Sequence, residues 1–317
     1  ADMSAPDLCR ALRLWSDSAN TPVIVLSANS GVAERVAERV ASLRAGAADY
    51  FVKPPDAQEL IARLRAALDL RRERAGFVIA VCSGKGGVGV STVAVNLAVG
   101  LRHETRGGVV LFDAGTRMGA ADILLNLQAR PGVDHLLAHL HEIEDSDFEA
   151  ILTPHASSVQ VLLLREEGLG VVEAEELRQV LFALRRLRDF VVVDVPSSFD
   201  DHAAAILEVA DRAVVVLTPE ITALRGAKLF LEWALRMGLP EQRILIVLNR
   251  YPQRGGLQRR AVENALGMAV EALVADDVKL VIYGINRGVP LVQSHRRSKV
   301  ARQVTALAKA LVKVAQS

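Results

Sequence analysis

The sequence predicts an α/β protein whose main domain is built on a mostly parallel, doubly wound sheet. Short apolar runs recur from residue 77 onward, and longer stretches with helical periodicity separate most of them. Strands that are apolar throughout are typical of sheets covered on both faces, and their alternation with helices is typical of parallel sheets. A glycine-rich loop directly follows the first run. The runs are residues 77–82, 109–113, 159–164, 190–195, 213–218 and 244–249.

Residues 1–75 are predicted to form a separate, smaller unit of strands and helices. Val36 and Val40 lie on one apolar stripe of its first predicted helix, and on the second we expect Ile61 and Leu64 to face inward. Gly76 ends the second helix after a basic stretch. We therefore place the domain boundary between residues 75 and 76. The predicted strands are residues 23–26 and 49–52, and the predicted helices are residues 31–44 and 56–74.

The composition excludes several classes of protein. The chain has 317 residues with 38 Lys+Arg and 37 Asp+Glu, and a net charge of +1 argues against a protein that coats nucleic acid. Although 51% of the residues are hydrophobic, no apolar stretch approaches the ~18–20 residues of a membrane-spanning helix. Cys9 and Cys82 are too few and too far apart for a disulfide framework or a metal site. A reducing cytosol fits this usage, and residues 1–13 lack the pattern of a signal peptide.

The strongest candidate site is the glycine-rich loop at residues 83–92, of sequence SGKGGVGVST. It follows an apolar strand and precedes a predicted helix, which is the context that a phosphate-binding loop requires. Its glycines allow backbone N–H groups to turn inward around an anion, and the helix that begins near Ser91 adds the positive end of its dipole. The ordinary pattern G-x-x-x-x-G-K-[ST] is matched at Gly84, Gly89 and Ser91, but Val90 occupies the lysine position.

This loop resembles the deviant phosphate-binding loop of the MinD/ParA family, a group of P-loop ATPases that dimerise around ATP. In that family an additional lysine early in the loop reaches the phosphates held by the partner subunit, and Lys85 occupies that place. The resemblance covers most of residues 77–317 and implies a MinD/ParA-like P-loop sheet. It also implies ATP or ADP, together with Mg²⁺, as cofactors.

Further motifs follow in the order that the family has them. Asp113 and Asp194 end two predicted strands, as the family's magnesium-binding aspartates do, but Gly115 stands where the family has a second aspartate that orients the attacking water. The resemblance assigns nucleotide binding to Gly84, Lys85, Gly86, Gly87, Val88, Gly89, Val90, Ser91, Thr92, Asn249 and Pro290. It assigns Mg²⁺ binding, partly through water, to Ser91, Asp113 and Asp194, and a weak catalytic contribution to Lys85 and Asp113.

The smaller unit resembles the second half of a response-regulator receiver domain, which has a flavodoxin-like fold. Ser27 matches the switch hydroxyl of that family, and Lys53 with Pro54 matches its lysine–proline pair. The receiver lysine contacts a phosphoryl group on an aspartate from an earlier strand, and Asp2 and Asp7 lie too close to the following helix to supply it. We therefore interpret residues 1–75 as a truncated or degenerate receiver-like domain, and residues 76–317 as the nucleotide-binding domain.

This domain combination is similar to the TadZ/CpaE family, which helps to localise the assembly machinery of Flp/Tad-type pili. The resemblance implies an ATP-binding, dimerising localisation factor whose partners are a second copy of the chain and proteins of a pilus or secretion machinery. We expect at most a weak ATPase, because Val90 and Gly115 replace two charged groups of the family's site. We expect it in the bacterial cytoplasm, at a cell pole or at the periphery of the inner membrane.

Two other functions stay open. The first is an active ParA-like ATPase that positions DNA or other cargo, for which Arg250, Arg254, Arg259 and Arg260 form a basic candidate surface. We favour a solvated surface there and expect no nucleic acid. The second is a phosphorylation-controlled response regulator. Residues 296–313 are basic with an apolar helical stripe, which we expect to pack on the protein's own sheet, so that membrane contact is at most peripheral.

Overall fold

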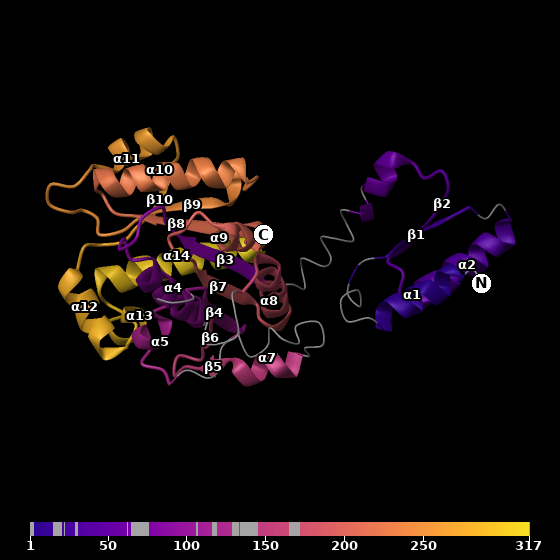
Figure 1. Ribbon diagram of the computed structural model, residues 1–317, viewed down its shortest axis with the longest axis horizontal. Coiled ribbons are helices and arrows are strands. Elements are labelled where there is room, and N and C mark those ends of the chain that lie inside the picture. The colour runs from indigo at the N-terminus through magenta and orange to yellow at the C-terminus, as the bar shows by residue number, and fades with distance from the viewer. Residues whose placement is uncertain are drawn as a thin grey trace. The chain divides into compact units, whose positions relative to one another are not determined.

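The chain divides into two compact units, Ala1–Ala75 and Gly76–Ser317. The structure is a computed structural model (Figure 1). The described residues are 3–14, 21, 23–28, 31–61, 63–64, 76–105, 107–115, 119–128, 133, 145–164 and 172–316. The larger unit confirms the predicted α/β fold with a mostly parallel sheet.

The larger unit is built on an eight-stranded sheet of order β10-β9-β8-β3-β7-β4-β6-β5. Every neighbouring pair is parallel except β5 and β6. All the residues of β4 and β7 are buried, because helices cover both faces of the sheet. The strands are β3 (Phe77–Cys82), β4 (Val109–Asp113), β5 (Thr153–Pro154), β6 (Gln160–Leu163), β7 (Phe190–Asp194), β8 (Arg212–Leu217), β9 (Ile244–Leu248) and β10 (Val270–Leu273).

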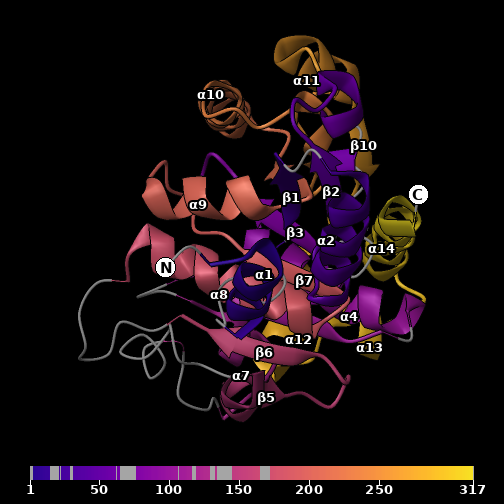
Figure 2. The same ribbon diagram turned by 90° about the vertical axis from the view of Figure 1, so that its right-hand side faces the viewer.

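Helices connect these strands and form the two outer layers. Figure 2 shows α8 and α9 on one side of the sheet and α4 with α14 on the other. The helices are α4 (Val90–Glu104), α5 (Ala121–Leu124), α7 (Asp145–Ile151), α8 (Ala174–Leu187), α9 (Asp201–Val209), α10 (Ile221–Arg236), α11 (Arg259–Leu266), α12 (Val278–Arg287), α13 (Leu291–Ser294) and α14 (Lys299–Gln316), with a 3₁₀ turn at Glu241–Arg243.

The last helix, α14, packs on the larger unit, as the sequence predicts, mainly along α4 and also against the edge strand β10. Its apolar stripe, which includes Val304, Leu307 and Leu311, is buried in the core of this unit. Gly100 of α4 permits the close approach, because a Cβ there would lie 3.3 Å from the Cβ of Ala308. The stripe therefore belongs to the fold of the larger unit. Among the helices that the structure describes, none has the length and apolar character needed to span a membrane.

The smaller unit contains one parallel pair of strands, β1 (Ile24–Ser27) and β2 (Asp49–Val52), joined through α2 (Val32–Arg44). Helix α1 (Ala5–Leu14) precedes them, and residues 57–61 and 63–64 are also helical. A small core of Cys9, Val25, Ala47 and Tyr50 holds the unit together.

Polar side chains take the inner positions of α2. Glu38 Oε2 accepts hydrogen bonds from Ser27 Oγ at 2.7 Å and from the Tyr50 hydroxyl at 2.9 Å. The apolar stripe faces outward instead, and Val36 is 58% exposed. The prediction that Ile61 and Leu64 face inward is wrong, since their side chains are 48% and 41% exposed. These hydrogen bonds hold the inner side of α2 to β1 and β2.

Candidate functional site

The glycine-rich loop lies at the carboxyl edge of the sheet, between β3 and α4. Gly87 and Gly89 have φ angles of +80° and +98°, in the left-handed region that glycine adopts without strain. A Cβ on Gly84 would lie 1.9 Å from the carbonyl oxygen of Gly226 in α10, so the two backbones meet where only glycine fits. The loop is thus held in a turned conformation at the start of a helix, with Gly86 and Gly87 exposed, as an anion site requires.

Val90, at the position of the missing lysine, is the first residue of α4. Its side chain is 8% exposed and belongs to the hydrophobic core. The substitution therefore adds apolar packing at the base of the loop and removes a cation from it. The next residue, Ser91, has its side chain within hydrogen-bonding reach of the Asp194 carboxylate.

Lys85 is held by two side chains of its own chain. Its Nζ donates to Thr222 Oγ1 at 3.0 Å and lies 3.4 Å from Glu220 Oε2. Both partners stand at the start of α10, directly after β8, which is the neighbour of β3 in the sheet. Sequence reasoning missed Glu220 and Thr222. The available signal was that β8 also ends at the edge where parallel strands gather their functional residues.

Asp113 and Asp194 end neighbouring strands and are paired in register. Burial raises the pKa of Asp194 to about 7; the charge of Asp113 adds to this, and the hydrogen bond from Ser91 opposes it. Burial also raises the pKa of Asp113, against the effect of backbone N–H donors. Two buried carboxylates beside a hydroxyl form an all-oxygen donor set of the kind that Mg²⁺ prefers. The structure thus brings the three predicted Mg²⁺ residues together.

The segment after Asp113 turns tightly at Gly115, the position where the resembling family has a second aspartate. Asp113 Oδ1 accepts a hydrogen bond from Gly115 N at 3.0 Å, and Oδ2 accepts one from Ala121 N at 2.9 Å. The chain therefore folds back tightly over this carboxylate. A Cβ on Gly115 would lie 3.0 Å from the Cα of Gly119, and a Cβ on Gly119 would lie 2.7 Å from Asp113 Oδ2. In this conformation, residue 115 cannot carry a side chain without a shift of the backbone.

Asn249 lies against the phosphate loop. Its Nδ2 donates to the carbonyl oxygen of Val88 at 2.7 Å, and a Cβ on Gly89 would lie 2.5 Å from that nitrogen. The following residue, Arg250, donates from Nη2 to the carbonyl oxygen of Gly87 at 3.3 Å. The structure thus brings the predicted asparagine to the loop and adds an arginine beside it.

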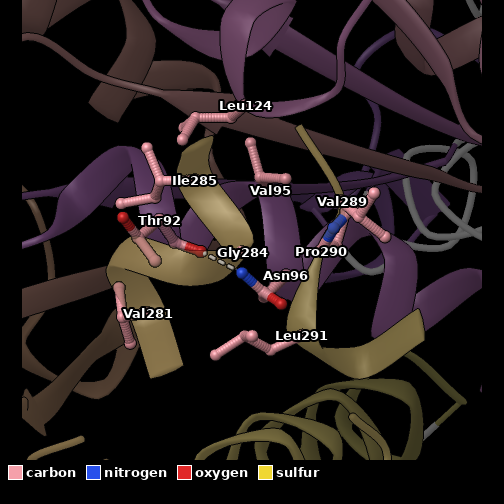
Figure 3. A pocket seen from close by; sticks show the side chains of 10 residues that line it. All are labelled: Thr92, Val95, Asn96, Leu124, Val281, Gly284, Ile285, Val289, Pro290 and Leu291. Carbon is pink, nitrogen blue, oxygen red and sulfur yellow. Dashed lines mark hydrogen bonds between the residues drawn. The ribbon is translucent and has the colours of Figure 1, made fainter. Parts of the chain in front are cut away.

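Pro290 stands at the start of α13 and lines a narrow cavity against α4 and α12 (Figure 3). The cavity has a volume of about 10 Å³, the space of a single water, and Asn249 is not among its lining residues. Asn96 connects its walls: Nδ2 donates to the Thr92 carbonyl at 2.9 Å, and Oδ1 accepts from Val292 N at 3.1 Å. Sequence reasoning missed Asn96, because an asparagine inside a predicted helix carries no motif.

Comparison with known proteins agrees with this geometry. A family model described as an AAA domain, AAA_31, matches residues 76–237. The chain belongs to this AAA-domain family. It is 28% identical over 236 residues to the septum site-determining protein MinD of Synechocystis, which covers 70% of this chain and 84% of that protein. The family match and this relative identify the larger unit as a MinD/ParA-like P-loop domain.

Two solved structures show the same fold. A ParA family ATPase from Chlorobium tepidum superposes with a TM-score of 0.68 at 21% identity, covering 74% of this chain and 99% of that one. The septum site-determining protein MinD of Pyrococcus horikoshii, in complex with Mg-ADP, superposes with a TM-score of 0.63 at 24% identity, covering 76% and 97%. The AAA-family chain therefore has the MinD/ParA arrangement of sheet, loop and helices.

Proposed function

We propose that the larger unit binds ATP or ADP with Mg²⁺ through residues 84–92 and uses the bound nucleotide to control self-association. The observation that carries this proposal is the loop itself: a turned, glycine-rich backbone at a helix start that keeps Lys85 and lies next to two buried aspartates. The Mg-ADP complex of the MinD relative supports the choice of ligand. Lys85 is the group that would reach the phosphates of a second copy.

The same site is a weak or inactive hydrolase in this proposal. Phosphoryl transfer depends on positioned groups that neutralise the developing charge, and loss of one such group costs about 10²–10³ in rate. Val90 supplies no charge, and the tight turn at Gly115 accepts a side chain only if the Gly119 backbone shifts. Asp113, Asp194 and Ser91 remain to hold Mg²⁺, so nucleotide binding survives better than turnover.

At the cellular level, we propose a bacterial localisation or assembly factor of a Flp/Tad-type pilus system. The supporting observation is the pairing of a small strand–helix unit that carries Ser27 and Lys53-Pro54 with a P-loop domain that lacks the ordinary lysine. Deletion of the gene in its bacterium tests this role, with pili counted by electron microscopy. Loss of pili, restored by the wild-type chain, is expected; a fully piliated deletion strain would refute the pilus role.

Three measurements on the purified full chain test the biochemical proposal. Calorimetric titration with ATP and ADP in Mg²⁺ should show binding that Ser91→Ala weakens. Light scattering after size exclusion should show a doubled mass with ATP and a single chain without it. Phosphate release should stay far below that of an ordinary MinD ATPase measured in parallel, and an equal turnover would contradict the account of Val90 and Gly115.

The DNA-binding alternative has less support. Arg259, one of the basic candidates, has local partners: its Nε donates to Glu263 Oε1 at 2.9 Å and its Nη2 to the Val270 carbonyl at 2.8 Å. Its charge is thus engaged in holding α11 to β10. Retention of DNA that falls steeply with salt would revive the alternative.

A further inference from the structure

Arg250 is placed unusually for an arginine. It follows β9 and Asn249, and its φ angle of +54° lies in the left-handed region, which is uncommon for a residue with a side chain. The Asn249 side chain holds this turn, because its Oδ1 accepts a hydrogen bond from Arg250 N at 2.9 Å. Backbone strain of this kind is found mainly where surrounding structure enforces it, often at ligand sites. The result is a guanidinium directed at the phosphate loop.

The contact of Arg250 with the loop is weak and replaceable. Its Nη2 reaches the carbonyl of Gly87 at 3.3 Å, a long hydrogen bond to a neutral acceptor at an exposed position. Within the described part of the chain, Arg250 is the one lysine or arginine from outside the loop whose side chain donates to it, and it forms no ion pair there with a carboxylate. A bound phosphate would offer this guanidinium a charged acceptor in place of a carbonyl.

We propose that Arg250 supplies the phosphate-binding charge that Val90 does not. On nucleotide binding the guanidinium leaves the Gly87 carbonyl and donates to oxygens of the β- or γ-phosphate. Arginine suits this exchange because its planar fork matches phosphate oxygens and its charge does not titrate near neutral pH. The inference rests on the proposed nucleotide binding and names a further phosphate-contacting residue within it.

The experiment compares Arg250→Ala, Arg250→Lys and the matched control Arg254→Ala, an exposed arginine in the same loop. Dissociation constants for ATP, ADP and adenosine are measured by calorimetry on the full chain with Mg²⁺. Arg250→Ala should weaken ATP about tenfold or more and leave adenosine unchanged, since the lost contact is a charge-assisted hydrogen bond to phosphate. An equal loss for ADP would assign the contact to the β-phosphate, and a smaller one to the γ-phosphate. Arg250→Lys should recover part of the loss, and Arg254→Ala should match the wild type.

A double variant separates this role from a merely structural one. If Arg250 replaces the absent loop lysine, Val90→Lys combined with Arg250→Ala should bind ATP more tightly than Arg250→Ala alone. Equal losses for ATP and adenosine would instead assign Arg250 to the base, and no loss would refute the inference while leaving the proposed function intact. A wild-type chain that binds no nucleotide would refute both. Thermal unfolding without nucleotide checks that every variant is folded.

Discussion

Replacing Asp194 with asparagine should stabilise the nucleotide-free protein at neutral pH. The side chain is 5% exposed, and burial beside Asp113 raises its pKa from 3.8 to about 7. Between these values the folded protein keeps a proton that the unfolded chain has released. Each pH unit in that window therefore lowers the free energy of unfolding by about 1.4 kcal/mol. The raised pKa of Asp194 therefore lowers the free energy of unfolding by about 2 kcal/mol at pH 5 and by about 4 kcal/mol at pH 8.

A side-chain amide at this position carries no charge, so Asp194→Asn should recover these amounts when Mg²⁺ is removed with EDTA. Urea unfolding at pH 5 and pH 8 measures the difference. A Trp15→Phe background leaves the fluorescence of Trp233, which packs against the core of the larger unit. Asp276→Asn, at an exposed position, serves as the matched control and should change little. A variant no more stable than wild type at pH 8, or equally stabilised at both pH values, would refute the reasoning.

Three further outcomes are expected. Val90→Lys should raise ATP turnover by about 10²-fold, because it returns a phosphate-neutralising group, and unchanged phosphate release would contradict this. Lys85→Ala should abolish the ATP-dependent increase in mass, whereas Glu220→Gln should strengthen it, because the lysine loses its ion pair. Light scattering with ATP measures the mass. An ATP-dependent dimer of the Lys85→Ala variant would contradict the proposal that Lys85 contacts the nucleotide of a second copy. Gly84→Ala should lower the unfolding temperature without nucleotide, because its Cβ would lie 1.9 Å from a backbone oxygen. Gly86→Ala is the control and should not lower it, because a Cβ there has open space around it. Equal unfolding temperatures for the two variants would argue against the close approach at Gly84.

The main strands were predictable because burial on both faces leaves an unmixed apolar run. The predicted run 77–82 coincides with β3, and the run 190–195 extends one residue beyond β7. The edge strand β10 was not predicted, because Glu271 interrupts its four residues. Its carboxylate Oε2 accepts a hydrogen bond from Ile246 N at 2.6 Å. A polar residue with a partner on the neighbouring strand gives no signal that a search for apolar runs can detect.

The candidate site was predictable where its residues follow one another in the chain, and less so elsewhere. The loop glycines and Ser91 form a continuous motif, and Asp113 and Asp194 each end an apolar strand, so the sequence predicts all of them. The partners of Lys85 come from 135 and 137 residues further along the chain, and only the strand order brings them to the loop. The hydrogen bonds of Glu38 in α2 could not be predicted for the same reason, since its hydroxyl partners lie on β1 and β2.

The two cations at the loop give a physical reason for nucleotide binding without efficient ATP hydrolysis in this protein. Lys85 is held by Glu220 and Thr222, and Arg250 by the carbonyl of Gly87, so each has an internal partner before nucleotide arrives. In our proposal, phosphate replaces both partners: Arg250 turns to the nucleotide of its own chain and Lys85 to that of a second copy. The free energy of binding is then used to rearrange side chains and join subunits. Val90 leaves no fixed cation at the helix start to stabilise the transition state, and this favours a switch over a catalyst.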